Sequence, residues 1–131
     1  MPVRVELIDE AVDDLARYVE SGQLPLFLKK LIRLEEVGRD AGLPLGGGLA
    51  GWRKIVVGDR HWRIIFTTDP DDTVATVWVI GDRDDAACYE VAERRVRERG
   101  KSQPRAASLA AVLFQLVQAQ RAAKKAARRQ R

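Results

Sequence analysis

Basic side chains within short apolar runs are the residues of this chain best suited to chemistry. Lys54 and Arg63 each lie inside a β-rich run rather than at its end, and a short turn separates the two runs. A cation in the middle of a half-buried strand is costly unless it reaches water or binds an anion. Arg83 follows the next β-rich run, and Tyr89 comes six residues later. We interpret these four side chains as a site whose chemistry suits a phosphate backbone.

The hydrophobic pattern predicts the elements that precede these residues. Residues 3–7 alternate apolar and charged side chains, as in a short edge strand. A first helix is predicted with Asp9 as its N-cap and Gly22 at its end. A second helix is predicted from Pro25 to Gly38, which is a plausible C-cap. We expect these two helices to form an antiparallel hairpin that packs its apolar stripe against a sheet.

Residues 39–51 interrupt the helical pattern and include three consecutive glycines. Neither a Gly-Lys-Ser/Thr sequence nor a helix follows them, so we interpret this segment as a connector rather than a phosphate-binding loop. Three further strands are predicted after it, separated by turns at 58–60 and 69–72, and a helix at 86–99 follows the last strand.

The charges of the 131-residue chain are divided unevenly between two segments. Residues 1–100 contain 15 Lys and Arg against 19 Asp and Glu, whereas residues 101–131 contain 8 Lys and Arg and no acidic residue. This length predicts one domain, at 1–100, with a basic and helical extension at 101–131. An acidic body with a basic extension is typical of a partner of nucleic acid or of the ribosome.

Cysteine and histidine usage excludes several classes of site. Cys88 is the single cysteine and His61 the single histidine, so neither an internal disulfide nor a zinc site of the usual kind is expected. No stretch has the length and hydrophobicity of a signal peptide or a membrane span. We therefore expect a cytoplasmic protein without a metal or other cofactor.

Four motifs occur in an order that resembles the RelE/ParE superfamily, the toxins of type II toxin–antitoxin modules. They are Trp-x-Lys ending at Lys54, Trp-Arg-Ile-Ile-Phe at 62–66, Ile-Gly-Asp-Arg ending at Arg83, and the later Tyr89. The resemblance covers roughly residues 3–97. It implies a small α+β domain with a four-stranded, mostly antiparallel sheet, a helical hairpin on one face and a closing helix.

The resemblance to RelE-type toxins also implies an activity, an endoribonuclease that cleaves mRNA in the ribosomal A site. In that reaction a ribose 2′-OH attacks the adjacent phosphate, and cations rather than a metal stabilise the phosphorane. Matched to the family pattern, Lys54, Arg63, Arg83 and Tyr89 are the catalytic candidates. The arginines would stabilise charge, Lys54 would act as a cation or base, and Tyr89 as a base or a stacking surface.

One position departs from the family pattern. Many RelE-type enzymes carry a second basic residue two positions after the lysine, where this chain has Val56. His61 is a candidate substitute because it precedes Arg63 by two residues and is therefore expected on the same strand face. We expect further RNA contacts from residues beside the strands and in the extension, namely Arg53, Arg60, His61, Trp52, Lys124, Lys125, Arg128 and Arg129.

Two other functions remain open on the sequence. The chain could be a ParE-like inhibitor of DNA gyrase, although ParE-type members generally lack the basic and tyrosine set found here. It could also be a catalytically weakened binding module, as Val56 allows. For the nuclease, the implied partners are a cognate antitoxin, the ribosome and mRNA. The stripe of Leu109, Val112, Leu113 and Leu116 in the extension is expected to dock on protein.

Overall fold

The computed structural model describes residues 2–45, 51–99 and 106–129, and it gives the backbone alone for 106 and 127–129. The fold is of the α+β class. Its elements, in chain order, are β1 (Arg4–Ile8), α1 (Asp9–Ala16), α2 (Leu24–Val37), a 3₁₀ turn (Gly38–Ala41), β2 (Leu43–Pro44), β3 (Trp52–Val57), β4 (Trp62–Thr68), β5 (Val74–Asp82), α3 (Asp85–Arg99), β6 (Ala106–Ser108) and α4 (Leu109–Arg129).

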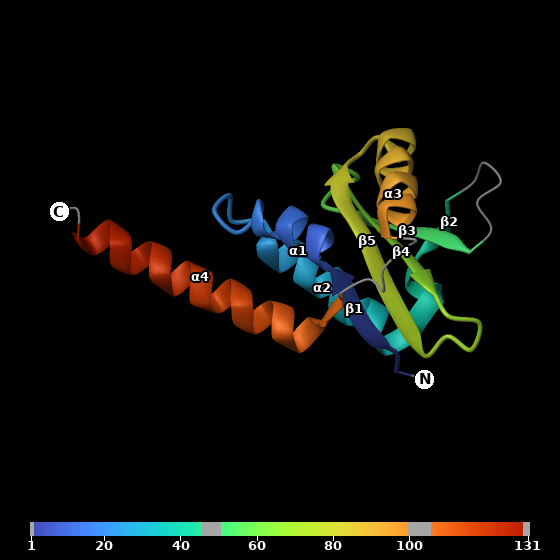
Figure 1. The fold of residues 1–131 in the computed structure, drawn as a ribbon, viewed down its shortest axis with the longest axis horizontal. Coiled ribbons are helices and arrows are strands. Elements are labelled where there is room, and N and C mark those ends of the chain that lie inside the picture. The colour runs from blue at the N-terminus through green and yellow to red at the C-terminus, as the bar shows by residue number, and fades with distance from the viewer. Residues whose placement is uncertain (1, 46–50, 100–105, 130–131) are drawn as a thin grey trace.

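A single twisted sheet with strand order β2-β3-β4-β5-β1-β6 forms the centre of the molecule (Figure 1). Strands β3, β4 and β5 form an antiparallel meander, β1 is parallel to β5, and β6 is antiparallel to β1. The predicted strands and the mostly antiparallel arrangement are confirmed, but the predicted count of four was too low. The two additional strands, β2 and β6, are short edge strands, and neither has enough residues to show an alternating pattern. Strand β1, which was predicted at an edge, lies inside the sheet because β6 pairs with it.

The helical hairpin covers one face of the sheet, as predicted, and α3 covers the other (Figure 1). Phe27, Leu31 and Leu34 of α2 are fully buried and pack with Ile64 and Phe66 of β4 in the main core. A smaller cluster beneath α3 contains Leu45, Ile65, Val79, Cys88 and Ala92.

The boundaries of the hairpin differ in part from the prediction. Asp9 is the first residue of α1 rather than its N-cap, and α1 ends at Ala16, so the chain reaches Gly22 through turns. Pro25 lies in the first turn of α2, and Gly38 is its C-cap with φ of 66°, as predicted. Glycine suits that C-cap because it adopts a positive φ without steric cost.

Asp14 joins α1, β5 and α3 where β1 no longer pairs with β5. The β1–β5 ladder ends at Val77, and the Asp14 carboxylate accepts a hydrogen bond of 3.0 Å from the backbone N–H of Ile80. It also accepts hydrogen bonds from Arg95 of α3, which in turn donates to the carbonyl of Trp78. These two side chains thereby satisfy backbone groups that would otherwise lie unpaired at the edge of β5.

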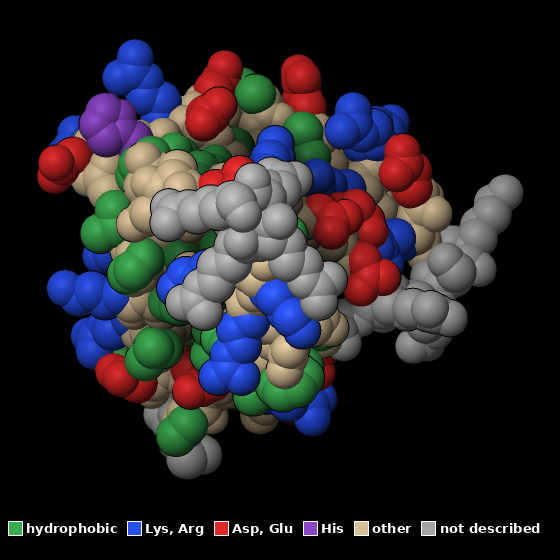
Figure 2. Space-filling view, turned by 90° about the vertical axis from the view of Figure 1, so that its left-hand side faces the viewer, with side chains coloured by type: hydrophobic (Ala, Val, Ile, Leu, Met, Phe, Trp, Pro, Cys, Tyr) green, Lys and Arg blue, Asp and Glu red, His purple; other side chains and the backbone are tan. Residues whose placement is uncertain are grey.

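The C-terminal extension begins as part of this core. Leu109, Val112 and Leu116 are buried in the main cluster, so the predicted apolar stripe docks on the chain's own domain. The C-terminal part of α4 projects away from the body (Figure 1). Viewed from the side toward which α4 projects, the molecule exposes several Lys and Arg side chains, with Asp and Glu side chains among them (Figure 2).

Within the described residues, no helix combines the length and the apolar character needed to cross a membrane.

Candidate active site on the α3 face of the sheet

The register of β3 and β4 places Lys54 and Arg63 on the same face of the sheet. Arg63 lies directly opposite Val56, and Val56 is two residues from Lys54 on β3, so all three point to the side covered by α3. Gly81 of β5 lies opposite Arg63 on its other side. The structure thus brings together the first two catalytic candidates as neighbours on adjacent strands.

Asp85, a residue that the sequence analysis did not identify, joins these two cations. One carboxylate oxygen accepts a hydrogen bond from Lys54 Nζ, and the other accepts one of 2.8 Å from Arg63 Nε. Asp85 is the first residue of α3, where an acidic side chain is ordinary because it favours the positive end of the helix dipole. Its position two residues after Arg83 was the only sequence feature that connected it to the site. No sequence pattern indicates which strand residues its side chain contacts.

Arg63 is held tightly on the sheet. Its side chain is 11% exposed, and Nη1 donates to the backbone carbonyls of Arg60, at 2.8 Å, and of Trp62, at 3.0 Å. Because Nε is bound to Asp85, Nη2 is the guanidinium nitrogen that has no hydrogen-bond partner among the described residues. In this state Arg63 does not present two free N–H groups to a phosphate in the bidentate geometry typical of arginine.

The ionisation of Asp85 reflects its two cationic partners. Partial burial raises the pKa of Asp85, but the hydrogen bonds and charges of Lys54 and Arg63 outweigh this effect, and the pKa lies below the usual value. The carboxylate is therefore charged at neutral pH. Burial and the nearby charge of Asp85 raise the pKa of the Cys88 thiol to about 11, so Cys88 is a buried, unreactive thiol.

Arg83 and Tyr89 lie at the same end of α3 as Asp85. Arg83 is exposed in the bend between β5 and α3 and has no hydrogen bond or ion pair among the described residues. Tyr89 follows Asp85 by four residues, which places both on one side of the helix, and its ring packs partly against the smaller cluster. The structure therefore brings the fourth candidate beside Asp85, while Arg83 remains free in solvent.

His61 does not occupy the position expected for a substitute catalytic base. The turn takes three consecutive residues with positive φ, Gly58, Asp59 and Arg60, so β4 begins only at Trp62. His61 is exposed in this turn, and its ring lies 5.6 Å from the ring of Trp62. The argument that His61 shares a strand face with Arg63 is therefore wrong, because His61 is not part of the strand.

Two expected RNA contacts have structural partners instead. Arg53 is half-buried, with Nε donating to the carbonyl of Arg39 at 2.8 Å and Nη2 to that of Gly42 at 2.9 Å, so it holds the 3₁₀ turn against β3. Trp52 is half-buried, and its ring lies 5.8 Å from that of Trp78. Trp62 packs on Tyr18 of the turn after α1 and on Phe27 of α2.

The remaining expected RNA contacts are far from this cluster or exposed beside it. Arg60 is exposed in the turn before β4, and Lys124 and Lys125 are exposed on the projecting part of α4. Arg128 and Arg129 lie in α4, but their side chains are outside the described residues.

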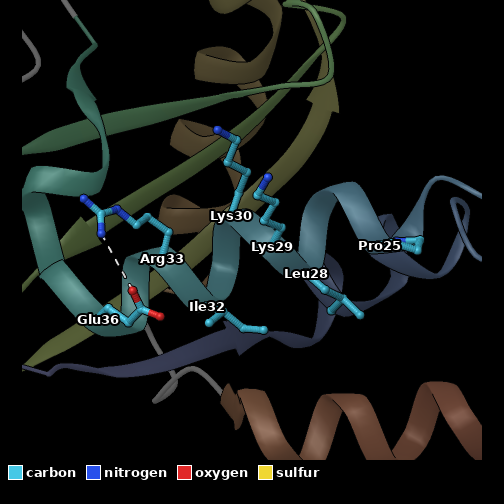
Figure 3. A pocket seen from close by; sticks show the side chains of 7 residues that line it. All are labelled: Pro25, Leu28, Lys29, Lys30, Ile32, Arg33 and Glu36. Atoms are coloured by element: carbon cyan, nitrogen blue, oxygen red, sulfur yellow. Dashed lines mark ion pairs between the residues drawn. The ribbon is translucent and has the colours of Figure 1, made fainter.

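A groove of about 700 Å³ lies elsewhere, on the outer side of α2 (Figure 3). Leu28 and Ile32 line it together with cationic side chains, of which Arg33 pairs with Glu36 at 3.7 Å. None of the catalytic candidates lines this groove. Within the described ranges, no group of three or more His, Cys, Asp or Glu side chains is arranged to hold a metal ion.

Comparisons with known proteins define the class of this fold. No protein-family model and no curated protein matches the sequence. The fold itself is that of the RelE-like toxins, as the sequence analysis expected. The structure is similar to that of a doubly substituted variant of the E. coli toxin RelE in the free state, with a TM-score of 0.59 and 21% identity. That likeness covers 73% of this chain and 99% of the other.

Two further structures support the same fold. The toxin–antitoxin complex RelBE2 of Mycobacterium tuberculosis matches with a TM-score of 0.53 and 21% identity, over 63% of this chain and 100% of the other. The isolated E. coli RelE toxin matches with a TM-score of 0.51 and 20% identity, over 73% and 99%. About a quarter or more of this chain lies outside each likeness.

Proposed function

We propose that this protein is the toxin of a type II toxin–antitoxin module and inhibits translation by cleaving mRNA on the ribosome. The observation that carries the proposal is the convergence of Lys54 and Arg63, from adjacent strands, on the two oxygens of one carboxylate. A pair of cations that holds two oxygens of one anion is suited to the non-bridging oxygens of a phosphodiester. The RelE-like fold supports the assignment.

The proposed reaction is an internal transfer at one phosphodiester. The ribose 2′-oxygen attacks the phosphorus and loses its proton to a base, while the bond from phosphorus to the 5′-oxygen breaks. The products are a 2′,3′-cyclic phosphate and a 5′-hydroxyl, which takes up a proton. Negative charge increases on the phosphoryl oxygens in the phosphorane, and Lys54 and Arg63 would stabilise it more strongly there than in the ground state.

Arg83 and Tyr89 have supporting roles in this proposal. Arg83 is exposed in the bend before α3 and would contact the phosphate from the solvent side. Its guanidinium could donate two hydrogen bonds to the phosphate oxygens. Tyr89, one helical turn from Asp85, would stack on a base or take the 2′-OH proton. The proposed partners are the ribosome and mRNA in the cytoplasm, and an antitoxin that covers the Lys54, Arg63 and Arg83 face.

A different observation favours a second candidate, a toxin-fold binding module without nuclease activity. Lys54 and Arg63 are already paired with Asp85, and Val56 occupies the place of a further cation. A ParE-like inhibitor of gyrase belongs to this class, because it would act through protein contacts and would need no free cations on this face.

An assay with defined ribosomes separates the two candidates. The purified chain is added to ribosomes carrying a defined mRNA with an empty A site, to the same mRNA alone, and to a gyrase supercoiling reaction. We expect cleavage of the ribosome-bound mRNA and no effect on supercoiling. Intact mRNA together with inhibited supercoiling would replace the nuclease with the gyrase inhibitor, and no effect in any of the three would leave a binding module.

A further inference from the structure

The Asp85 carboxylate lies between Lys54 and Arg63, the two cations that the proposed function assigns to the substrate phosphate. Each of its oxygens accepts a hydrogen bond from a different cation, in the manner of two non-bridging oxygens of a phosphodiester. The three side chains are thus a complete ion cluster before any substrate arrives. An RNA phosphate that approached the same two cations would meet a negative charge already in contact with them.

Burial explains why the cluster holds a carboxylate. The side chains of Arg63 and Lys54 are only 11% and 21% exposed, so water alone would compensate their neighbouring positive charges poorly. Asp85 supplies the missing negative charge and fixes the orientation of both cations. Its own side chain is 40% exposed, which leaves it a path into solvent.

The N-terminal cap of α3 is supplied by Asp84 rather than by Asp85. The Asp84 side chain accepts a hydrogen bond of 3.0 Å from the backbone N–H of Ala87, and its carbonyl accepts one of 3.0 Å from Cys88. Asp84 therefore caps the helix, while the Asp85 carboxylate is directed at the two strand cations. The acidic group at this position serves the cation pair rather than the helix end.

We propose that Asp85 is an intramolecular competitor for the substrate phosphate. It orders Lys54 and Arg63 in the free protein, and it must release them before both can bind the scissile phosphodiester. This inference rests on the proposed function, because that function identifies the anion as an RNA phosphate. It assigns Asp85 the role of a residue that limits affinity for substrate and leaves the bond-breaking steps to the other side chains.

The test compares two isosteric substitutions that each remove one negative charge. Asp85→Asn removes the competing charge, and Asp84→Asn is the matched control, because asparagine also caps a helix and Asp84 contacts neither cation. The probe is a dinucleotide monophosphate with a 2′-O-methyl group, which cannot react. Its affinity for each full-length variant is measured by NMR titration of the Arg63 Nε–H signal at fixed ionic strength.

We expect Asp85→Asn to bind the dinucleotide at least about tenfold more tightly than the wild type, which corresponds to about 1.4 kcal/mol. Asp84→Asn should change the affinity by no more than about twofold, as expected for an exposed charge screened by salt. Equal affinities for Asp85→Asn and the wild type would overturn the proposal. Asp85→Ser, which also lacks the charge, replaces the first variant if Asp85→Asn does not fold.

Failure of this proposal is distinguishable from failure of the proposed function. If Asp85→Asn binds the dinucleotide more tightly but neither protein cleaves ribosome-bound mRNA, the competition is real and the nuclease assignment is wrong. If the wild type cleaves mRNA and the two proteins bind the dinucleotide equally, the nuclease assignment stands and Asp85 is not a competitor.

Discussion

Arg63 Nε lies 2.8 Å from Asp85 Oδ1, so the central cation of the candidate site also attaches the first turn of α3 to β4. A substitution at either residue therefore acts on catalysis and on the packing of α3 together. The side chain of Arg63 is only 11% exposed, so it takes part in packing as well as carrying charge. Experiments on this site need a measure of folding beside the measure of activity.

A double-mutant cycle on Arg63→Ala and Asp85→Ala should show this attachment. We expect a coupling free energy of about 1 kcal/mol in urea unfolding, because the pair is charge-assisted but Asp85 is partly exposed and screened. The matched pair Arg33→Ala and Glu36→Ala, which is more exposed on both sides, should give a smaller coupling. A coupling near zero for Arg63 and Asp85 would show that the ion pair contributes nothing to the fold.

Asp14→Ala should be among the more destabilising substitutions outside the apolar core. It removes the acceptor for Arg95 and for the Ile80 N–H, and Asp14 is only 3% exposed. We expect a loss of about 3 kcal/mol in the free energy of unfolding, because the Arg95 guanidinium, which is only 14% exposed, loses its carboxylate partner. Asp13→Ala, at the exposed neighbouring position, should change stability by less than about 0.5 kcal/mol. Similar values for the two variants would contradict the role given to Asp14.

Acid should destabilise the protein partly through Glu10. The hydrogen bond from Arg99 lowers the pKa of Glu10 despite partial burial, which acts in the opposite direction. A carboxyl whose pKa is lowered in the folded state stabilises the fold above its unfolded pKa, about 4.3 for glutamate, and the effect is lost as pH falls through the folded value. Asp85 acts in the same direction.

The pH dependence can be assigned with two variants. Glu10→Gln should lose less stability than the wild type when unfolding is measured from pH 6 down to pH 3. Glu90→Gln, at an exposed glutamate with no ion pair among the described residues, should follow the wild-type curve. If Glu10→Gln has the same acid dependence as the wild type, the Arg99 pair does not account for it.

Two truncations should separate the structural and the exposed parts of α4. Removal of all residues after Gly100 deletes Leu109, Val112 and Leu116 from the main core, and we expect insolubility or a loss on the order of 5 kcal/mol. Removal of residues after Gln120 deletes only exposed positions among those described, and the fold should remain intact. A stable, soluble chain that ends at Gly100 would contradict the packing described for α4.

The same shorter truncation tests the basic end of α4 as a nucleic-acid contact. We expect the chain that ends at Gln120 to co-sediment with ribosomes less than the full chain, with a weaker dependence on salt because fewer cations meet phosphates. Identical salt dependence for the two chains would remove this role from Lys124 and Lys125.

The elements that have a clear local sequence signal could be predicted from the sequence. The alternation of β1, the apolar stripe of α2 and the Gly58 turn each specify a local conformation, and the structure has all three. Strand β6 could not be predicted, since Ala106, Ala107 and Ser108 have little preference for strands and pair with β1, which lies at the other end of the sequence.

The two cations of the site, Lys54 and Arg63, could be predicted from the sequence, whereas its acidic residue, Asp85, could not. Lys54 and Arg63 are unusual within strands, so their positions alone indicate a site. Asp85 begins a helix, where aspartate is common, and its partners are 31 and 22 residues earlier in the chain. Asp14 escaped prediction for the same reason, because its partner Arg95 is 81 residues away. Long-range ion pairs depend on tertiary packing, so a local sequence pattern does not predict which residues will pair.

The most direct test of the central claim is the single-turnover rate of mRNA cleavage on programmed ribosomes by the wild type, Arg63→Ala and Arg53→Ala. Both variants are first shown to be folded, and Arg53 is the control arginine because it holds the 3₁₀ turn. We predict cleavage by the wild type, a reduction of about 10²–10³-fold in Arg63→Ala, and a much smaller change in Arg53→Ala. Equal rates for folded Arg63→Ala and the wild type would contradict the account.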